Sequence, residues 1–140
     1  SIGWGVALAQ PDQRVWVITG DGEMLMGLGS LSTVGLQQPK NLAVVVLDNE
    51  HFGETGMQTT HTAASVNLAE IARASGISSS WTVRESSEIS TTREKLLHEE
   101  GPLFCGIKVR AETLPLVLPP KEGEILQKRF RNALMNENGD

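Results

Sequence analysis

Residues 15–24 read VWVITGDGEM, and the rest of the chain is arranged around this stretch. The apolar run 15–18 does not alternate with polar residues, which predicts a strand covered on both faces. Gly20 and Gly22 then bound a tight turn and let the backbone come close to a ligand. Because a Leu-, Met- and Gly-rich segment follows, the stretch predicts a strand, a turn that holds Asp21, and a helix.

A second strand is predicted at residues 42–47, and Asp48 and Asn49 follow it directly. In an open parallel sheet, ligands bind at the carboxyl ends of the strands. Asp21 and Asn49 would each place an oxygen donor at such an end. Oxygen ligands of this kind suit Mg²⁺ or Ca²⁺, so the two ends predict a divalent cation that holds a phosphate group.

The remaining segments alternate between helix and strand. Pro11 ends a first helix near Gln10, Asn67 is expected to cap one helix, and Ser87 another. Connection 48–64 is long, which is typical of a functional loop. The predicted helices are 1–10, 23–38, 68–75, 88–100 and 122–134, and the predicted strands are 14–19, 42–47, 81–83 and 103–109. This order predicts a three-layer α/β fold whose mostly parallel sheet has helices on both faces.

Length and composition indicate one globular domain. We expect it to span residues 1–135, truncated at its amino-terminal edge, with a frayed tail at 136–140. A net charge of −5 without a basic cluster argues against nucleic acid, and no apolar run is long enough for a membrane helix. Cys105, the single cysteine, lies in an apolar run and is expected in the core. A cytoplasmic location is expected.

Two common phosphate-binding motifs do not fit the turn. A dinucleotide fingerprint would need a third glycine at position 25, which is leucine, and a P-loop would need a Gly-Lys-Ser/Thr sequence. Asp21 would also face the phosphates of a dinucleotide directly. A cation between the carboxylate and the phosphates removes this conflict, and the amides of Gly22, Glu23 and Met24 at a helix N-terminus suit the phosphates.

Gly20-Asp21-Gly22, followed by Asn49 at 28 positions after the aspartate, resembles the motif of thiamine diphosphate-dependent enzymes. Asp48 stands where the family often has a first asparagine. The Leu-Asp-Asn run and the later Gly53-x-Thr55-Gly56 are most similar to decarboxylases of sulfopyruvate and phosphonopyruvate. The resemblance covers nearly the whole chain and implies the diphosphate-binding (C-terminal) domain of this family, with its thiamine diphosphate-binding fold.

The resemblance assigns roles by position. Asp21 and Asn49 match the side-chain ligands of Mg²⁺, and His51 matches the residue that offers its backbone carbonyl. It also implies cofactor contacts at Gly20, Asp21, Gly22, Glu23, Met24, Asn49, His51, Gly53, Glu54 and Thr55. Glu54, His51 and His61 are candidate catalytic acids or bases, with solvated loop residues as the alternative.

The same resemblance implies half of an active site. A pyrimidine-binding domain on another chain or in a separate segment would complete it, within a homo- or hetero-oligomer. The expected activity is decarboxylation of a small 2-oxo acid such as sulfopyruvate or phosphonopyruvate. Three alternatives stay open: an acetolactate-synthase-like component, a non-catalytic cofactor-binding or regulatory subunit, and an α/β nucleotide-binding module without thiamine.

Overall fold

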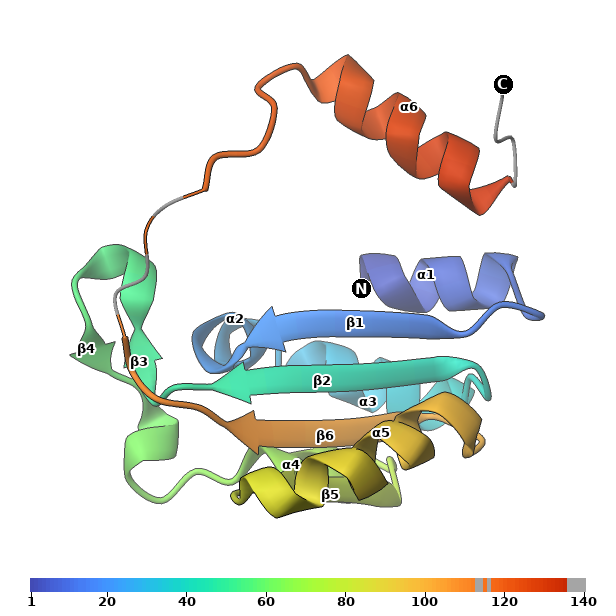
Figure 1. The fold of residues 1–140 in the computed structure, drawn as a ribbon. Helices are drawn as coiled ribbons and strands as arrows, with labels where there is room; N and C mark the ends of the chain where they lie inside the picture. Colours follow the sequence, from blue (N-terminus) through green and yellow to red (C-terminus); the bar gives the residue numbers. More distant parts are fainter. Residues whose placement is uncertain (113–114, 116, 136–140) are drawn as a thin grey trace.

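Four parallel strands form the main sheet of the computed structural model, which describes residues 1–112, 115 and 117–135. The strand order is β1 (Val15–Gly20), β2 (Leu42–Asp48), β6 (Leu103–Lys108) and β5 (Ser79–Val83), as Figure 1 shows. All three pairings are parallel. β2 is therefore central, as its continuous apolar run predicts, and the carboxyl ends of all four strands meet at one edge.

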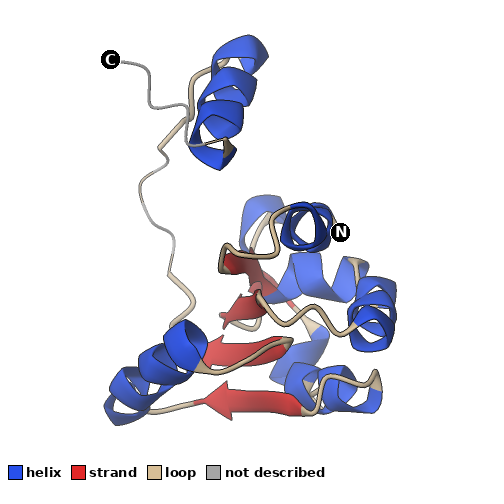
Figure 2. Cartoon of the chain, turned by 90° about the vertical axis from the view of Figure 1, so that its right-hand side faces the viewer, coloured by secondary structure: helices blue, strands red, loops and turns tan. Residues whose placement is uncertain are grey.

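Helices cover both faces of the sheet, so the predicted three-layer fold is confirmed (Figure 2). One face carries α1 (Ile2–Ala9), α2 (Asp21–Met26), α3 (Gly29–Gln37) and α4 (Leu68–Ala74). The other face carries α5 (Ile89–His98). Alternate residues of each strand point to opposite faces, which gives the sheet two separate cores.

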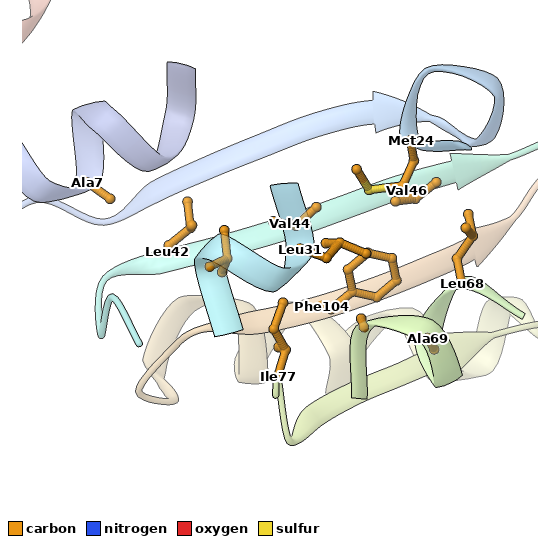
Figure 3. Close-up of a cluster of buried hydrophobic side chains, with 12 residues drawn as sticks. Ala7, Met24, Leu31, Leu42, Val44, Val46, Leu68, Ala69, Ile77 and Phe104 are labelled. Atoms are coloured by element: carbon orange, nitrogen blue, oxygen red, sulfur yellow. The ribbon is translucent and has the colours of Figure 1, made fainter. Parts of the chain in front are cut away.

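The larger core lies under the four helices and is centred on Phe104, which is fully buried (Figure 3). Val44 and Val46 of β2 point into this core, together with Leu31 of α3. The smaller core lies under α5, where Val45 packs with Cys105 and Leu96. Cys105 is fully buried, which confirms the core position predicted for it, and burial raises the pKa of its thiol to about 12.

The helix predicted at residues 23–38 is wrong in its bounds. The structure divides it into α2 and α3 at Gly27 and Leu28, and Asp21 is already the first residue of α2. Glycine lowers helix propensity by about 1 kcal/mol relative to alanine, so the helix ends where glycines gather. Leu36, one of the apolar residues of the predicted helix, is exposed.

Connection 48–64 contains regular structure that the sequence did not indicate, because β3 (His51–Phe52) and β4 (Gln58–Thr59) pair as an antiparallel hairpin. One other expectation needs correction. Ser87 does not cap α5. Instead, the carboxylate of Glu88 accepts hydrogen bonds from the amides of Arg84 and Glu85, which stabilises a 3₁₀ turn before the helix.

The cap predicted at Asn67 is confirmed, since its side-chain oxygen accepts hydrogen bonds from the amides of Ala69 and Glu70 at 3.0 and 3.2 Å. Beyond β6 the chain leads to α6 (Gly123–Leu134), which stands apart from the sheet in both views (Figures 1 and 2). No helix in the described parts of the chain combines the length and apolar character needed to cross a bilayer. The tail predicted at 136–140 lies outside the described residues.

Candidate functional site

The carboxyl ends of β1 and β2 bring the predicted metal ligands to the same edge of the sheet. Gly20 and Leu47 are paired in the register of these strands, so Asp21 and Asp48 follow at the same level and Asn49 comes next. Asp21 is 1% exposed. A carboxylate is rarely buried to this extent unless charged or polar groups surround it.

Two threonine hydroxyls surround the Asp21 carboxylate. Thr60 Oγ1 donates to Asp21 Oδ2 at 2.5 Å, and Thr62 Oγ1 lies 3.2 Å from the same oxygen. Both threonines follow the β3–β4 hairpin, which returns the chain to the edge of β2, where the amide of Thr60 donates to the carbonyl of Glu50. The hairpin therefore holds the two hydroxyls against Asp21.

Asp48 belongs to an ion-pair network on the other side of Thr62. Thr62 Oγ1 donates to Asp48 Oδ1 at 2.7 Å, and Lys108 Nζ lies 2.9 Å from Asp48 Oδ2. Lys108 also contacts Glu50 Oε1 at 2.5 Å. Burial alone would lower the pKa of Lys108, but the hydrogen bonds to Glu50 and Asp48 outweigh this effect and raise the pKa above its ordinary value.

Asn49 and His51 form a tight turn immediately after β2. The backbone amide of His51 donates to Asn49 Oδ1 at 2.9 Å, and the ring Nδ1 of His51 lies 2.9 Å from the carbonyl of Asn49. Glu50, between them, has a positive φ of 63°. The side-chain oxygen of Asn49 keeps a second lone pair, so it can still accept a metal ion.

A cavity of about 380 Å³ opens at this edge of the sheet. Its volume lies within the range of small-molecule sites. The lining includes most of the residues predicted to bind the cofactor: Gly20, Asp21, Gly22, Glu23, Asn49, His51, Gly53, Glu54 and Thr55. The structure therefore brings both sides of the predicted site, the turn after β1 and the loop after β2, to one cavity.

The first turn of α2 is fixed by Glu23. Its carboxylate Oε2 accepts hydrogen bonds from the Thr19 hydroxyl at 3.0 Å and from the Gly20 amide at 2.6 Å. A side chain at Gly22 would lie only 2.7 Å from the ring of Phe52, so glycine is required for this close approach. The glycine allows the loop after β2 to lie directly over the N-terminus of α2.

Two predicted residues do not line the cavity. The side chain of Met24 points into the larger core, where it is 7% exposed, so only its backbone amide could serve a ligand. His61 is exposed in a 3₁₀ turn (His61–Ala63) beyond the hairpin and is absent from the cavity lining. Among the three candidate acids or bases, the structure thus places His51 and Glu54 at the cavity and His61 outside it.

The cavity also contains residues that the sequence did not identify. Phe52 comes from the hairpin, and Arg110 and Glu112 come from the chain just beyond β6. Arg110 Nε pairs with Glu112 Oε1 at 3.1 Å, which places a cation at the rim of the cavity. The sequence could have indicated Arg110 and Glu112 as candidates, because a strand predicted at 103–109 in a parallel sheet must end at the same edge as β2.

The donor set fits a hard cation better than a transition metal. No group of three or more His, Cys, Asp or Glu side chains that could hold a metal occurs in residues 1–112, 115 and 117–135. What the cavity offers is one buried carboxylate, one amide oxygen and backbone oxygens, beside a helix N-terminus suited to phosphate. Mg²⁺ is usually bound by one or two protein carboxylates together with phosphate oxygens and water.

Fold and site together define a parallel α/β domain whose strand ends hold a buried carboxylate beside a cavity of small-molecule size. The chain belongs to the thiamine pyrophosphate enzymes: their C-terminal TPP binding domain matches residues 1–107. The family recognised from Gly20, Asp21, Gly22 and Asn49 is thereby confirmed.

Named relatives agree with this family. The chain is 40% identical over 141 residues to sulfopyruvate decarboxylase subunit beta of Methanocaldococcus jannaschii. This alignment covers 96% of the chain and 70% of the relative. It is 37% identical over 136 residues to phosphonopyruvate decarboxylase of Streptomyces viridochromogenes, covering 94% of this chain and 33% of that protein.

A solved structure shows the same fold. The thiamine diphosphate-dependent 4-hydroxybenzoylformate decarboxylase of Rhodococcus jostii aligns with a TM-score of 0.57 and 18% identity, covering 77% of this chain and 21% of that one. The chain described here thus spans about a fifth of that enzyme and about a third of the phosphonopyruvate decarboxylase.

Proposed function

We propose that this chain is the diphosphate- and Mg²⁺-binding half of a thiamine diphosphate-dependent 2-oxo acid decarboxylase. The observation that carries the proposal is the buried carboxylate of Asp21 at a cavity that also contains Asn49 and the N-terminus of α2. The names of the relatives support a substrate of the sulfopyruvate or phosphonopyruvate type, a short 2-oxo acid with a second anionic group.

In this proposal, Asp21 and Asn49 hold Mg²⁺ through their side-chain oxygens, and His51 contributes its backbone carbonyl. The amides in the first turn of α2 hold the diphosphate, because they carry the partial positive charge of a helix N-terminus. Gly53, Glu54 and Thr55 also line the cavity. The close approach of Phe52 to Gly22 supports this proposal, because it holds the loop after β2 against the first turn of α2.

When bound, thiamine diphosphate supplies the electron sink that decarboxylation of a 2-oxo acid requires. The residues of this chain orient it and limit the access of water. His51 and Glu54 are the titratable side chains of the predicted catalytic set that reach the cavity, and we assign proton transfer to this pair. The assignment gives His61 no catalytic role within this chain.

A partner completes the site in this proposal. Relatives named as subunit beta imply a second subunit, which would carry the pyrimidine-binding half and one wall of the substrate site. The cavity described here contains the diphosphate side of such a site. We expect the chain alone to bind the cofactor weakly and to show no turnover until the partner is added.

Calorimetric titration with thiamine diphosphate tests the proposal. It is performed with Mg²⁺ and with a chelator, on this chain alone and with its pyrimidine-binding partner. Binding should require the metal and tighten with the partner, and Asp21→Asn should abolish it. Asp12→Asn is the matched control, because Asp12 is an exposed turn residue far from the cavity.

Other outcomes would assign the chain differently. Metal-dependent binding without turnover in any partner complex would indicate a cofactor-binding or regulatory subunit. Condensation of two 2-oxo acids would indicate an acetolactate-synthase-like component. Binding of a nucleotide without Mg²⁺, and no binding of thiamine diphosphate, would contradict the proposal and leave a nucleotide-binding α/β module.

A further inference from the structure

Two buried threonines connect the carboxylate of Asp21 to that of Asp48. Thr60 and Thr62 are 4% and 6% exposed. Their hydroxyl oxygens lie 2.9 Å apart, Thr60 contacts Asp21 Oδ2 at 2.5 Å, and Thr62 contacts Asp48 Oδ1 at 2.7 Å. The result is a continuous chain of hydrogen-bonding groups from the end of β1 to the end of β2, and the assigned roles of the site leave it unexplained.

The number of protons fixes how this chain is ordered. Two hydroxyls supply two protons, and two ionised carboxylates can only accept. The Thr60 hydroxyl donates to Asp21, and the Thr62 hydroxyl lies 2.7 Å from Asp48 Oδ1 and 3.2 Å from Asp21 Oδ2, so its proton is shared between the two carboxylates. Asp21 Oδ2 is thereby occupied, whereas Asp21 Oδ1 receives no hydrogen bond from the described residues. One defined oxygen of the carboxylate therefore remains for a ligand.

Lys108 forms ion pairs with Asp48 and Glu50, at the far end of this chain from Asp21. Its ammonium contacts Asp48 Oδ2 at 2.9 Å and Glu50 Oε1 at 2.5 Å, and it also lies 3.4 Å from the carbonyl of Thr62. Lys108 and Asp48 are register partners in the pairing of β2 with β6, so the sheet itself places them together. One ammonium group thus partly compensates the charges of Asp48 and Glu50, whereas no cationic side chain of the described residues pairs with Asp21.

We propose that Thr60 and Thr62 are positioning residues that fix the rotation of the Asp21 carboxylate and make its site selective for Mg²⁺ over Ca²⁺. The inference rests on the proposed function, since it takes Asp21 as a metal ligand. Mg²⁺ demands near-ideal octahedral geometry with short bonds, whereas Ca²⁺ accepts longer bonds and variable geometry. A carboxylate held by two hydroxyls favours the more demanding ion, and a freely rotating one does not.

The test removes each hydroxyl and measures metal affinity. Thr60→Val and Thr62→Val keep the branched shape, Thr60→Ser keeps the hydroxyl, and Thr92→Val is the matched control. Thr92 is equally buried, but it lies in α5 on the opposite face of the sheet. Mg²⁺ and Ca²⁺ are each titrated calorimetrically into the assembled protein in a fixed excess of thiamine diphosphate, and folding is checked by circular dichroism.

Loss of an outer partner of a metal ligand typically costs 10- to 100-fold in metal affinity. We expect a loss of about that size for Mg²⁺ in Thr60→Val, a clearly smaller loss for Ca²⁺, and recovery of the wild-type ratio in Thr60→Ser. Thr62→Val should shift the ratio in the same direction. Should Thr60→Val fail to fold, Thr60→Ala removes the same hydroxyl without introducing the bulk of valine.

The experiment distinguishes failure of the positioning role from failure of the proposed function. If the wild-type protein binds thiamine diphosphate with Mg²⁺ and the hydroxyl-free variants keep the Mg²⁺ to Ca²⁺ ratio of Thr92→Val, the positioning role is refuted while the proposed function stands. If the wild-type protein binds neither metal nor cofactor, both are refuted. An equal loss of both metals in all three valine variants would indicate a general effect on folding and would also contradict the proposal.

Discussion

Replacing Gly35 by alanine should destabilise the protein, although alanine favours helices. Gly35 lies in α3, where α3 crosses the end of α4. A Cβ atom at this position would lie 1.8 Å from the carbonyl oxygen of Ser75 and 3.2 Å from the Cα of Gly76. Contacts below 3.0 Å are essentially never found for real Cβ atoms, so the two helices must move apart by more than 1 Å.

The magnitude follows from two opposing effects. Alanine gains about 1 kcal/mol over glycine within a helix, and overpacking of a core costs about 1–3 kcal/mol. The upper end applies here, because the clash is with backbone that cannot rotate away. The separation would also weaken the hydrogen bond from Gln38 Nε2 to the Gly76 carbonyl, now 2.9 Å long. We expect Gly35→Ala to reduce the free energy of unfolding by about 2 kcal/mol.

Gly29→Ala is the matched control in the same helix. No atom lies within 4 Å of a Cβ built at Gly29, so this substitution should be neutral or stabilise by up to about 1 kcal/mol. Urea unfolding followed by tryptophan fluorescence measures both variants, and the midpoint of Gly35→Ala should fall by roughly 1 M. A Gly35→Ala protein as stable as Gly29→Ala would refute the close approach of α3 and α4.

Three further predictions concern a cap, a buried thiol and the ligand. Asn67→Ala should reduce the free energy of unfolding by about 1 kcal/mol in the same urea assay, because the amides of Ala69 and Glu70 lose their side-chain acceptor; an unchanged midpoint would contradict this cap. The pKa of Cys105 is raised from 9.0 to about 12, so its stabilisation is complete below pH 9 and is lost as the pH rises toward 12, by up to about 1.4 kcal/mol per pH unit. Cys105→Val should not lose this stability between pH 9 and 11. If the free energy of unfolding of both proteins fell equally with pH, the loss would not come from the buried thiol. Thiamine diphosphate with Mg²⁺ at 100 times its dissociation constant should stabilise the folded protein by about 2.7 kcal/mol, and chelation should reverse the accompanying rise in melting temperature; a rise that survives the chelator would exclude a metal-dependent site.

The sequence predicts the parts of this molecule that depend on local signals. Residues 42–47 form an unbroken apolar run, and such a run belongs to a central parallel strand, where β2 is found. Asn67 before an apolar periodic segment predicts a cap that the structure contains. Asp21 and Asn49 could be placed at one edge because parallel strands have their carboxyl ends together.

Features that depend on contacts between distant segments were not predictable in the same way. The hairpin of β3 and β4 has only two residues in each strand, too few for a period to show in the sequence. Thr60 and Thr62 look like ordinary loop residues until the hairpin returns them to Asp21. Arg110 reaches the cavity because β6 pairs with β2; the sequence predicts that both strands end at one edge of the sheet, but not that they are neighbours.

The helix predicted at 23–38 failed for a different reason. Its apolar residues are spaced well enough for one continuous helix, but Gly27 and Leu28 interrupt it. The interruption leaves α2 short. The carboxylate of Glu23 anchors the start of this helix, because it accepts a hydrogen bond from the amide of Gly20. The fold thus gives the predicted phosphate-binding turn its own small helix, separate from the α3 that packs on α4.

A crystal structure of the protein with Mn²⁺ in place of Mg²⁺ and with thiamine diphosphate would test the central claim most directly, because the anomalous signal locates the metal. The account predicts one peak within about 2.3 Å of a carboxylate oxygen of Asp21 and of the side-chain oxygen of Asn49, with the diphosphate against the first turn of α2. A peak elsewhere, or a diphosphate bound away from Asp21 with no metal between them, would contradict the account.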